Sequence, residues 1–381
     1  MRTEIVFAAG AVGQLGTLAR QCGVRRVLLV TDPGIVRAGH AERAESSLAA
    51  AGLVVARFDE VTENPTTGVV EACLALARSH RPDLLVGLGG GSSIDTAKGC
   101  NFLLGGGRME DYWGNGKARG PMLPLIAAPT TAGTGSECQS FALISQQDTH
   151  VKMACGDPQA APRIALLDPQ LTLTQPASVA AASGIDALAH AVESAVTSKR
   201  NPISQMFSRE SFRRAIDALP RVLADPGDLE SRGDMLLAAA LAGLAIENSM
   251  LGAAHSAANP LTAHYSMAHG QAVGMMLPAV IRLNAEDARA RKIYHELAVE
   301  AGLIPRGGDP QQGAIALAAR IEEILALAGL ARSLSELGIG PLPLDALARE
   351  AAGQWTARFN PRPVAAEDFA RLYQSVSGQP A

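Results

Sequence analysis

The chain changes character near residue 180, and this change limits the folds that it can adopt. Before that point, short apolar runs alternate with stretches of helical periodicity, and each run ends near Gly, Pro or Asp. The apolar runs occupy residues 26–31, 53–58, 83–88, 123–128 and 164–168. Strands that alternate with helices form a parallel sheet, because each crossover returns the chain to the same end of the sheet. We therefore predict an α/β first half.

After residue 180 the strand signals nearly disappear. Ala- and Leu-rich stretches with helical spacing take their place, for example residues 236–247 and 314–331. A chain of 381 residues is also too long for a single hydrophobic core. We predict two domains, an α/β domain over residues 1–180 and an all-helical domain over residues 181–381.

Composition excludes several classes of protein. Charged residues make up 18%, aromatic residues 4%, and the net charge is -4, which argues against a disordered chain and against a nucleic-acid partner. The longest apolar run, residues 235–246, is shorter than a membrane span requires. Five cysteines without a C-x-x-C pair, and a first segment without the pattern of a signal peptide, predict a cytoplasmic protein with no membrane partner.

Two loops that follow predicted strands have the composition of a phosphate site. The sequence Gly89-Gly90-Gly91-Ser92 precedes a helical turn, where glycines let an anion approach the backbone and the helix N-terminus attracts negative charge. The second loop, PTTAGTGSE at residues 129–137, carries hydroxyl groups that suit pyrophosphate and ribose. A tight turn and a polar surface loop are the alternatives. Two such loops at the ends of neighbouring strands favour a nucleotide crevice.

Asp32 ends the strand predicted at residues 26–31. From this position a carboxylate can accept a hydrogen bond from an adenosine ribose hydroxyl and repel a 2′-phosphate, which favours NAD over NADP. An acid before Pro33-Gly34 is equally expected in a simple turn.

In the second half, Asp186 and His190 stand four residues apart, on one face of the predicted helix. The apolar stretch that follows carries His255, His264 and His269. One carboxylate and three imidazoles would form an N/O ligand set suited to Fe²⁺ or Zn²⁺. By spacing alone His264 is as good a candidate as the other two histidines. A surface or capping role is the alternative for the first pair.

These motifs resemble those of the iron-containing, or group III, alcohol dehydrogenase family, within a superfamily that includes glycerol dehydrogenase and dehydroquinate synthase. The resemblance runs over nearly the whole chain. It rests on GGGSSIDTAK (89–98), PTTAGTGSE (129–137), GIDALAHAVE (184–193), AHGQAVGMMLP (268–278) and Asn360-Pro361-Arg362. It implies a Rossmann-like dinucleotide-binding domain, which is the α/β first half, and a helical metal-binding domain.

The resemblance also implies site residues. Those expected to bind NAD are Asp32, Asn64, Gly89, Gly90, Gly91, Ser92, Asp95, Thr130, Thr131, Thr134, Ser136 and Lys152. Those expected to bind the metal, Fe²⁺ or alternatively Zn²⁺, are Asp186, His190, His255 and His269, which leaves His264 out.

The implied function is an NAD(H)- and divalent-metal-dependent alcohol dehydrogenase or aldehyde reductase. It would transfer hydride between nicotinamide and a small alcohol or carbonyl polarised by the metal, as a homodimer or larger homo-oligomer. A maleylacetate-reductase-like enzyme, a dehydroquinate-synthase-like enzyme and a non-catalytic nucleotide-binding protein are the alternatives. The complete ligand set argues against the first and third, and the lack of Lys and Arg in residues 251–278 argues against the second.

One position departs from the family pattern. Members commonly carry a further histidine four residues after the position of His255, near the nicotinamide, which is proposed to relay protons. Asn259 stands there in this chain. An amide cannot titrate near neutral pH, so we expect the proton to pass by water or a ribose hydroxyl.

Overall fold

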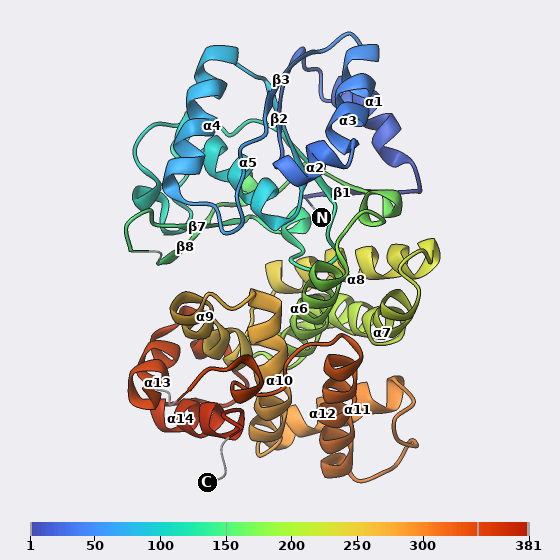
Figure 1. Ribbon diagram of the computed structural model, residues 1–381, viewed down its shortest axis with the longest axis vertical. Coiled ribbons are helices and arrows are strands. Elements are labelled where there is room, and N and C mark those ends of the chain that lie inside the picture. Colours follow the sequence, from blue (N-terminus) through green and yellow to red (C-terminus); the bar gives the residue numbers. More distant parts are fainter. Residues whose placement is uncertain (1, 150, 341–342, 379–381) are drawn as a thin grey trace. The chain divides into compact units, whose positions relative to one another are not determined.

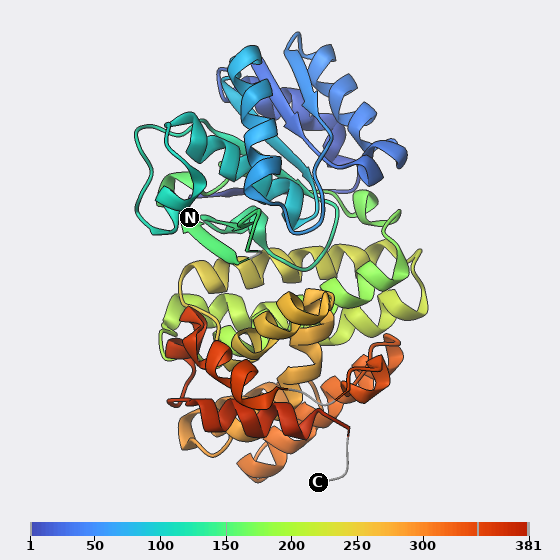
Figure 2. The same cartoon turned by 60° about the vertical axis from the view of Figure 1, so that its left-hand side comes forward.

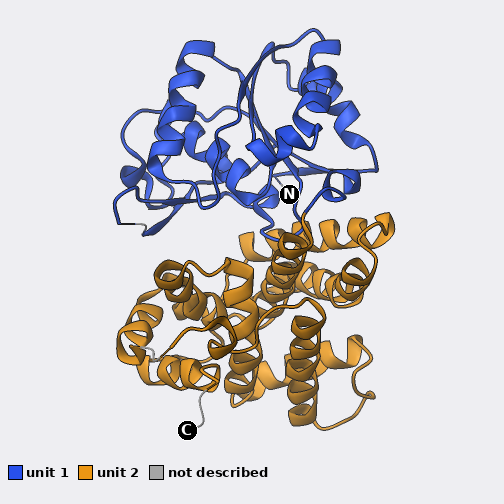
Figure 3. Cartoon of the chain, viewed as in Figure 1, with its two compact units in different colours: residues 1–175 blue, residues 176–381 orange. Residues whose placement is uncertain are grey.

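The structure is a computed structural model that describes residues 2–149, 151–340 and 343–378. The chain divides into two compact units, residues 1–175 and 176–381 (Figure 3).

The first unit is built on a six-stranded sheet in which all the pairings are parallel. The strand order is β1-β9-β6-β4-β2-β3. The strands are β1 (Glu4–Phe7), β2 (Arg26–Val30), β3 (Val54–Phe58), β4 (Leu84–Gly89), β6 (Leu125–Pro129) and β9 (Ile164–Leu167). The helices are α1 (Leu15–Gln21), α2 (Pro33–Arg37), α3 (His40–Ala50), α4 (Thr67–His80) and α5 (Gly91–Leu104).

Two hydrophobic cores lie on opposite faces of this sheet, because successive strand residues point to opposite sides. Leu28 and Val30 of β2 pack in one core with apolar residues of α4 and α5. Val27 and Leu29 pack in the other core with residues of α1 and α3. Figures 1 and 2 show helices on both sides of the sheet. The nearly continuous apolar runs of β2, β4 and β6 follow from burial on both faces.

A small three-stranded sheet extends the first unit. Its strand order is β5-β8-β7, with β5 (Gly114–Asn115), β7 (Phe141–Ser145) and β8 (Lys152–Gly156). β7 and β8 pair antiparallel, and Ser145 lies opposite Lys152. The sheet carries Lys152 close to the loop before α4, where Thr66 bridges to Ser145.

The second unit is helical. Its long helices are α6 (Ala177–Val196), α7 (Pro202–Ala224), α8 (Leu229–Glu247), α9 (Ala253–Tyr265), α10 (His269–Asn284), α11 (Ala288–Glu300), α12 (Pro310–Leu327), α13 (Leu344–Gly353) and α14 (Ala366–Ser375). Several begin at a side-chain cap, for instance Asn201 before α7 and Asp309 before α12. Over the described residues, no helix combines the length and apolar character needed to cross a membrane.

This architecture confirms the predicted fold class, a parallel α/β sheet followed by a helical half. The five predicted strands are present as β2, β3, β4, β6 and β9. The prediction missed β1 at the sheet edge and the β7–β8 pair. Both end residues of β1 are exposed, and β7 and β8 are only partly buried, so burial on both faces does not mark these strands as it marks β2, β4 and β6.

Candidate active site

In the first unit, the loops predicted to hold a nucleotide meet at one edge of the sheet. β2, β4 and β6 are neighbours, so the segments after their carboxyl ends come together: Asp32, residues 89–92 and residues 130–136. The amide of Thr130 donates to the carbonyl of Gly89 at 3.0 Å. The carboxyl ends of neighbouring parallel strands are where α/β sheets bind their ligands.

Close packing explains the glycines of the first loop. Gly89 has φ of +148°, and a methyl group there would come within 2.4 Å of Ser93 Oγ. A methyl group at Gly91 would lie 2.7 Å from Thr134 Cγ2. Gly89 is therefore favoured by its backbone conformation, and Gly91 by the close approach of the second loop. Gly91 also begins α5, whose first N–H groups have no partner within the helix. This cradle fits the phosphates of a dinucleotide.

Buried polar groups fix the second loop to α5. Lys98 Nζ is inaccessible to solvent and donates to the Ser136 carbonyl at 2.7 Å, to Ser136 Oγ at 2.7 Å and to the Phe141 carbonyl at 2.8 Å. Asp95 accepts from Ser136 Oγ at 2.5 Å and from the Leu143 amide at 3.0 Å. Burial raises the pKa of Asp95, and the charge of Lys98 opposes that rise. Asp95 and Ser136 thus hold the loop in place through contacts within the protein.

Asp32 has two partners. Its Oδ1 accepts from the amides of Gly34 and Ile35 at 2.8 and 3.1 Å and so caps α2, as an acid in a simple turn before Pro33-Gly34 would do. Its Oδ2 lies 3.3 Å from Ser93 Oγ, next to the glycine loop. The carboxylate therefore lies beside the predicted phosphate cradle as well as at a helix start.

Asn64 and Lys152 come from distant parts of the sequence and meet in the structure. Lys152 Nζ donates to Asn64 Oδ1 at 3.1 Å. Asn64 has a left-handed φ of +51°, a conformation that asparagine tolerates better than most residues.

In the second unit, α6, α9 and α10 bring the four predicted metal ligands together. Asp186 and His190 lie on α6, His255 lies on α9, and His269 begins α10. Each histidine directs its Nε2 atom toward Asp186 Oδ1. The distance is 3.5 Å for His190, 3.4 Å for His255 and 3.9 Å for His269. The rings of His190 and His255 stack with centroids 4.7 Å apart.

These separations fit a metal ion. An ion with tetrahedral bonds of about 2.1 Å keeps its ligand atoms roughly 3.4 Å apart. The ligand atoms of Asp186, His255 and His269 all lie within 4.8 Å of one another. Asp186 Oδ1 and His255 Nε2 are buried and make no hydrogen bond with any described residue. Buried polar atoms without partners are uncommon, and a shared cation would satisfy both.

The electrostatics favour the same interpretation. Burial alone would raise the pKa of Asp186, but the neighbouring imidazoles hold it well below its ordinary value. Burial alone would lower the pKa of His255, but the carboxylates of Glu193 and Asp186 raise it to about 9. Asp186 is therefore ionised, and a metal ion that binds beside it would take the place of the proton on His255. The side chain of His269 is 29% exposed, so the cluster is open to solvent on one side.

Glu193 is a residue of this centre that sequence reasoning missed. It is buried, its Oε2 hydrogen-bonds to His255 Nδ1, and its Oε1 accepts from the Ala254 amide at 2.7 Å. A signal was present in the sequence, because residues 186, 190 and 193 recur on one face of an otherwise apolar helix.

Two further predicted positions lie outside the cluster of ligand atoms. His264 forms an exposed contact with Glu350 at 2.8 Å. Asn259 lies on α9, where its Nδ2 donates to Gln354 Oε1 at 3.0 Å.

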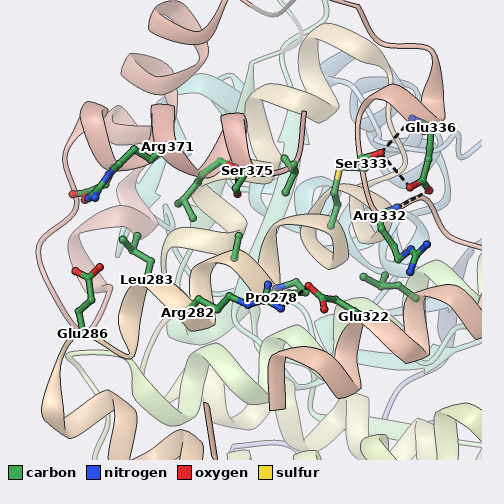
Figure 4. A pocket seen from close by; sticks show the side chains of 16 residues that line it. Pro278, Arg282, Leu283, Glu286, Glu322, Arg332, Ser333, Glu336, Arg371 and Ser375 are labelled. Atoms are coloured by element: carbon green, nitrogen blue, oxygen red, sulfur yellow. Dashed lines mark hydrogen bonds and ion pairs between the residues drawn. The ribbon is translucent and has the colours of Figure 1, made fainter. Parts of the chain in front are cut away.

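A groove of about 620 Å³ in the second unit lies between α10, α12, α14 and the loop at residues 332–336 (Figure 4). Its rim carries charges of both signs, among them Arg282, Glu286 and Arg371. No predicted metal ligand lines it, so the groove is separate from the candidate centre.

Comparisons with protein families match both halves of the chain. Residues 2–169 match the model described as iron-containing alcohol dehydrogenase. Residues 180–377 match the model described as the C-terminal part of the Fe-containing alcohol dehydrogenase family.

Individual proteins are similar over nearly their full length. The NAD-dependent methanol dehydrogenase of Bacillus methanolicus is 32% identical, with 97% of each chain covered. A solved 1,3-propanediol oxidoreductase is 30% identical with a TM-score of 0.94, covering 98% of this chain and 97% of that one. The sulfoacetaldehyde reductase of Bifidobacterium kashiwanohense, solved in complex with NAD⁺, is 26% identical with a TM-score of 0.90, covering 100% and 98%.

Proposed function

The chain belongs to the iron-containing alcohol dehydrogenase family, and we propose that it interconverts a small alcohol and the corresponding aldehyde or ketone. It is an NAD-dependent oxidoreductase whose cofactors are NAD and iron. The observation that carries the proposed reaction is the convergence of one carboxylate and three imidazoles in the second unit.

We assign dinucleotide binding to the edge of the sheet in the first unit. The N-terminus of α5 and the loop at residues 130–136 would hold the pyrophosphate, and Asp32 would accept a hydrogen bond from the adenosine ribose. Asn64 and Lys152, which are hydrogen-bonded to each other, would contact the nicotinamide half. Asp95 and Lys98 would support this site through their hydrogen bonds to Ser136, which hold the loop in place.

We assign metal binding to Asp186, His190, His255 and His269. When bound, Fe²⁺ or Zn²⁺ would supply Lewis acidity toward a substrate oxygen. The protein's contribution is to keep Asp186 ionised and to point the Nε2 atoms of the three histidines toward Asp186 Oδ1. Burial of Asp186, His190 and His255 excludes water from most of the cluster, which strengthens electrostatic effects there.

Proton transfer must differ from the pattern that the family resemblance implies. Asn259 carries an amide that is engaged with Gln354, and it can neither take nor release a proton near neutral pH. We therefore propose that the alcohol proton leaves through water or a ribose hydroxyl.

The function is tested by incubating metal-loaded protein with NADH and a panel of small aldehydes. We expect steady, stoichiometric loss of NADH absorbance with at least one aldehyde. A dehydroquinate-synthase-like enzyme would recycle its NAD within each turnover and consume no NADH, and a non-catalytic protein would bind NADH without consuming it. A maleylacetate-reductase-like enzyme would remain active after a chelator has removed divalent metal.

His269→Ala provides the matched test of the metal. This variant should lose turnover and bind divalent metal at least about 100-fold more weakly, because it removes one of four ligands. His264→Ala is the control, since His264 lies in the same segment and contacts Glu350 instead of the cluster. An active, metal-free His269→Ala enzyme would overturn the assignment.

Two broader proposals accompany the reaction. The five cysteines, all of which are free thiols, support a reducing and therefore cytoplasmic location. We also propose a homodimer or larger homo-oligomer, for which size-exclusion chromatography with light scattering is the test.

A further inference from the structure

The start of α9 carries His255 and has no cap of its own. Gly252 occupies the N-cap position and has no side chain to accept from the first amides of the helix. Two residues from other parts of the second unit accept instead. Glu193 Oε1 accepts from the Ala254 amide at 2.7 Å, and Asn360 Oδ1 accepts from the Ala253 amide at 3.2 Å.

The fit around Gly252 shows how closely these caps approach. A methyl group there would lie 3.0 Å from Asn360 Oδ1 and 3.2 Å from Glu193 Oε1. Asn360 is held in turn by Asn284, the last residue of α10, through a pair of amide hydrogen bonds of 2.7 and 3.0 Å. The caps therefore connect α6, α9 and the far end of α10, the three helices that carry the metal ligands.

The second oxygen of Glu193 contacts the His255 ring. A carboxylate only accepts hydrogen bonds, so Nδ1 of His255 must be the donor in its contact with Glu193 Oε2. A metal ion displaces one proton from the ring when it binds, and the hydrogen bond to Glu193 keeps the proton on Nδ1, so Nε2 is the nitrogen that becomes available to the ion. Nε2 is also the atom that lies 3.4 Å from Asp186 Oδ1 and makes no hydrogen bond with a described residue.

We propose that Glu193 is a positioning residue that selects Nε2 of His255 as the metal ligand, while the same carboxylate caps the helix that carries this histidine. The inference rests on the metal site of the proposed function. It gives a role to the last residue of the GIDALAHAVE motif, and Asn360 supports that role by fixing the same helix end.

Glu193→Gln leaves one acceptor for two tasks, the capping of α9 and the hydrogen bond to His255. The Ala254 amide and His255 Nδ1–H both require an acceptor, and a glutamine amide offers one oxygen and one donating nitrogen. The single oxygen of glutamine can accept from the Ala254 amide or from His255 Nδ1–H, but not from both. When metal is bound to His255 Nε2, one of these two donors therefore lacks an acceptor. We expect affinity for Zn²⁺ and Co²⁺, measured by competition with a chelator, to fall about 10- to 100-fold. The visible spectrum of the Co²⁺ form should change as well.

Glu350→Gln is the matched control. It alters a second Glu–His contact on α9, that of His264, which does not face the ligand cluster. This variant should bind both ions as the wild type does. NADH affinity should be unchanged in both variants, which shows that the chain is folded.

A double-mutant cycle distinguishes positioning from a general structural effect. If Glu193 acts through His255, adding Glu193→Gln to His255→Ala should lower metal affinity by less than about twofold further. A loss in the double variant as large as in the wild-type background would overturn the proposal. So would a Glu193→Gln protein with wild-type affinity and an unchanged Co²⁺ spectrum.

If Glu193→Gln does not accumulate as folded protein, the wild type still decides the question. Long-range ¹H–¹⁵N correlation spectra of the Zn²⁺-loaded, histidine-labelled protein report which nitrogen of each ring carries the proton. We expect the proton on Nδ1 of His255, and a proton on Nε2 would overturn the proposal. Wild-type protein that binds neither ion would overturn the metal site itself, whereas a failure confined to Glu193→Gln would leave the proposed function intact.

Discussion

Asp32 performs two tasks that a substitution can separate. Its Oδ1 caps α2, and its Oδ2 faces Ser93 beside the glycine loop. Asp32→Gly removes the charge but leaves a residue that is tolerated at the N-cap, at a cost of a few tenths of a kcal/mol. Without the carboxylate a 2′-phosphate is no longer repelled. We expect the preference for NAD over NADP, as the ratio of kcat/KM values, to narrow by about tenfold or more.

Asp309→Gly is the control for that change. Asp309 also precedes a proline and caps a helix, since its Oδ1 accepts from the Gln311 amide, but it lies in the second unit. The control should lose a similar amount of stability with no change in cofactor preference. An unaltered preference in Asp32→Gly would refute charge repulsion as the source of NAD selectivity.

Glu137 follows Ser136 in the second loop and is completely buried. Burial raises its pKa from 4.5 to about 7, and the charge of Lys98 opposes this rise. Between these two values the unfolded chain releases the proton while the folded chain keeps it. The free energy of unfolding should therefore fall as pH rises from about 4.5 to 7 and then stay level. The whole loss amounts to roughly 3 kcal/mol.

Glu137→Gln remains neutral at every pH and should lack this loss. We expect urea denaturation at pH 8 to show the variant to be more stable than the wild type by up to about 3 kcal/mol. At pH 4.5 the two should be similar. The control is Glu71→Gln, because Glu71 is exposed on α4 of the same unit. Equal stability of Glu137→Gln and wild type at pH 8 would contradict the expected cost of the buried charge.

At the scale of single residues, the sequence predicts candidate ligands better than it predicts the residues that hold those ligands in position. Asp186, His190, His255 and His269 are candidates because charged or imidazole groups within apolar stretches need an explanation. His264 is an equal candidate on that ground, and only the family resemblance leaves it out. The roles of Glu193 and Asn360 depend on where α9 begins in space and on which of its amides lack partners. Neither fact can be read from spacing along the chain.

At the scale of elements, the four inner strands and the edge strand β3 were predictable, whereas β1 and the β7–β8 pair were not. β2, β4 and β6 are buried on both faces, so continuous apolar runs announce them. β7 and β8 are as long as β2 but partly exposed, and their pairing brings Lys152 to Asn64. That contact of cofactor-site candidates depends on a sheet that sequence reasoning did not predict.

The close approach of α10 to α6 gives an element-scale prediction. A methyl group at Gly270 would come within 2.0 Å of the Ala182 carbonyl oxygen, which is backbone and cannot move away easily. Gly270→Ala should push the start of α10, and His269 with it, away from Asp186. We expect metal affinity to fall by more than about tenfold, since ligand geometry tolerates only small displacements.

Gly353→Ala is the comparison for this variant. Gly353 ends α13, and a methyl group there meets no other atom within 4 Å. Its metal affinity should match that of the wild type. Wild-type affinity in Gly270→Ala would mean that the two helices can separate without disturbing the cluster.

At the scale of the whole molecule, the two kinds of ligand belong to different units. The candidate metal ligands lie within residues 176–381, and the candidate dinucleotide residues lie within residues 1–175. The change in composition near residue 180 predicts two domains, and the family resemblance assigns dinucleotide binding to the first and metal binding to the second. The change in composition could not show which loops and helix ends approach one another, since those contacts depend on the register of the sheet and on the packing of helices.

Amide hydrogen exchange with mass spectrometry tests that division of ligand binding. A ligand that binds only the folded site slows exchange in proportion to its concentration over its dissociation constant. Removing metal with a chelator should therefore speed exchange in α6, α9 and α10 by at least about tenfold, with far smaller effects on the sheet of the first unit. Adding NADH should slow exchange at the start of α5 and in residues 130–136. Metal-dependent protection centred on residues 89–92, or NADH protection centred on α9 and α10, would contradict the assignment of the two sites.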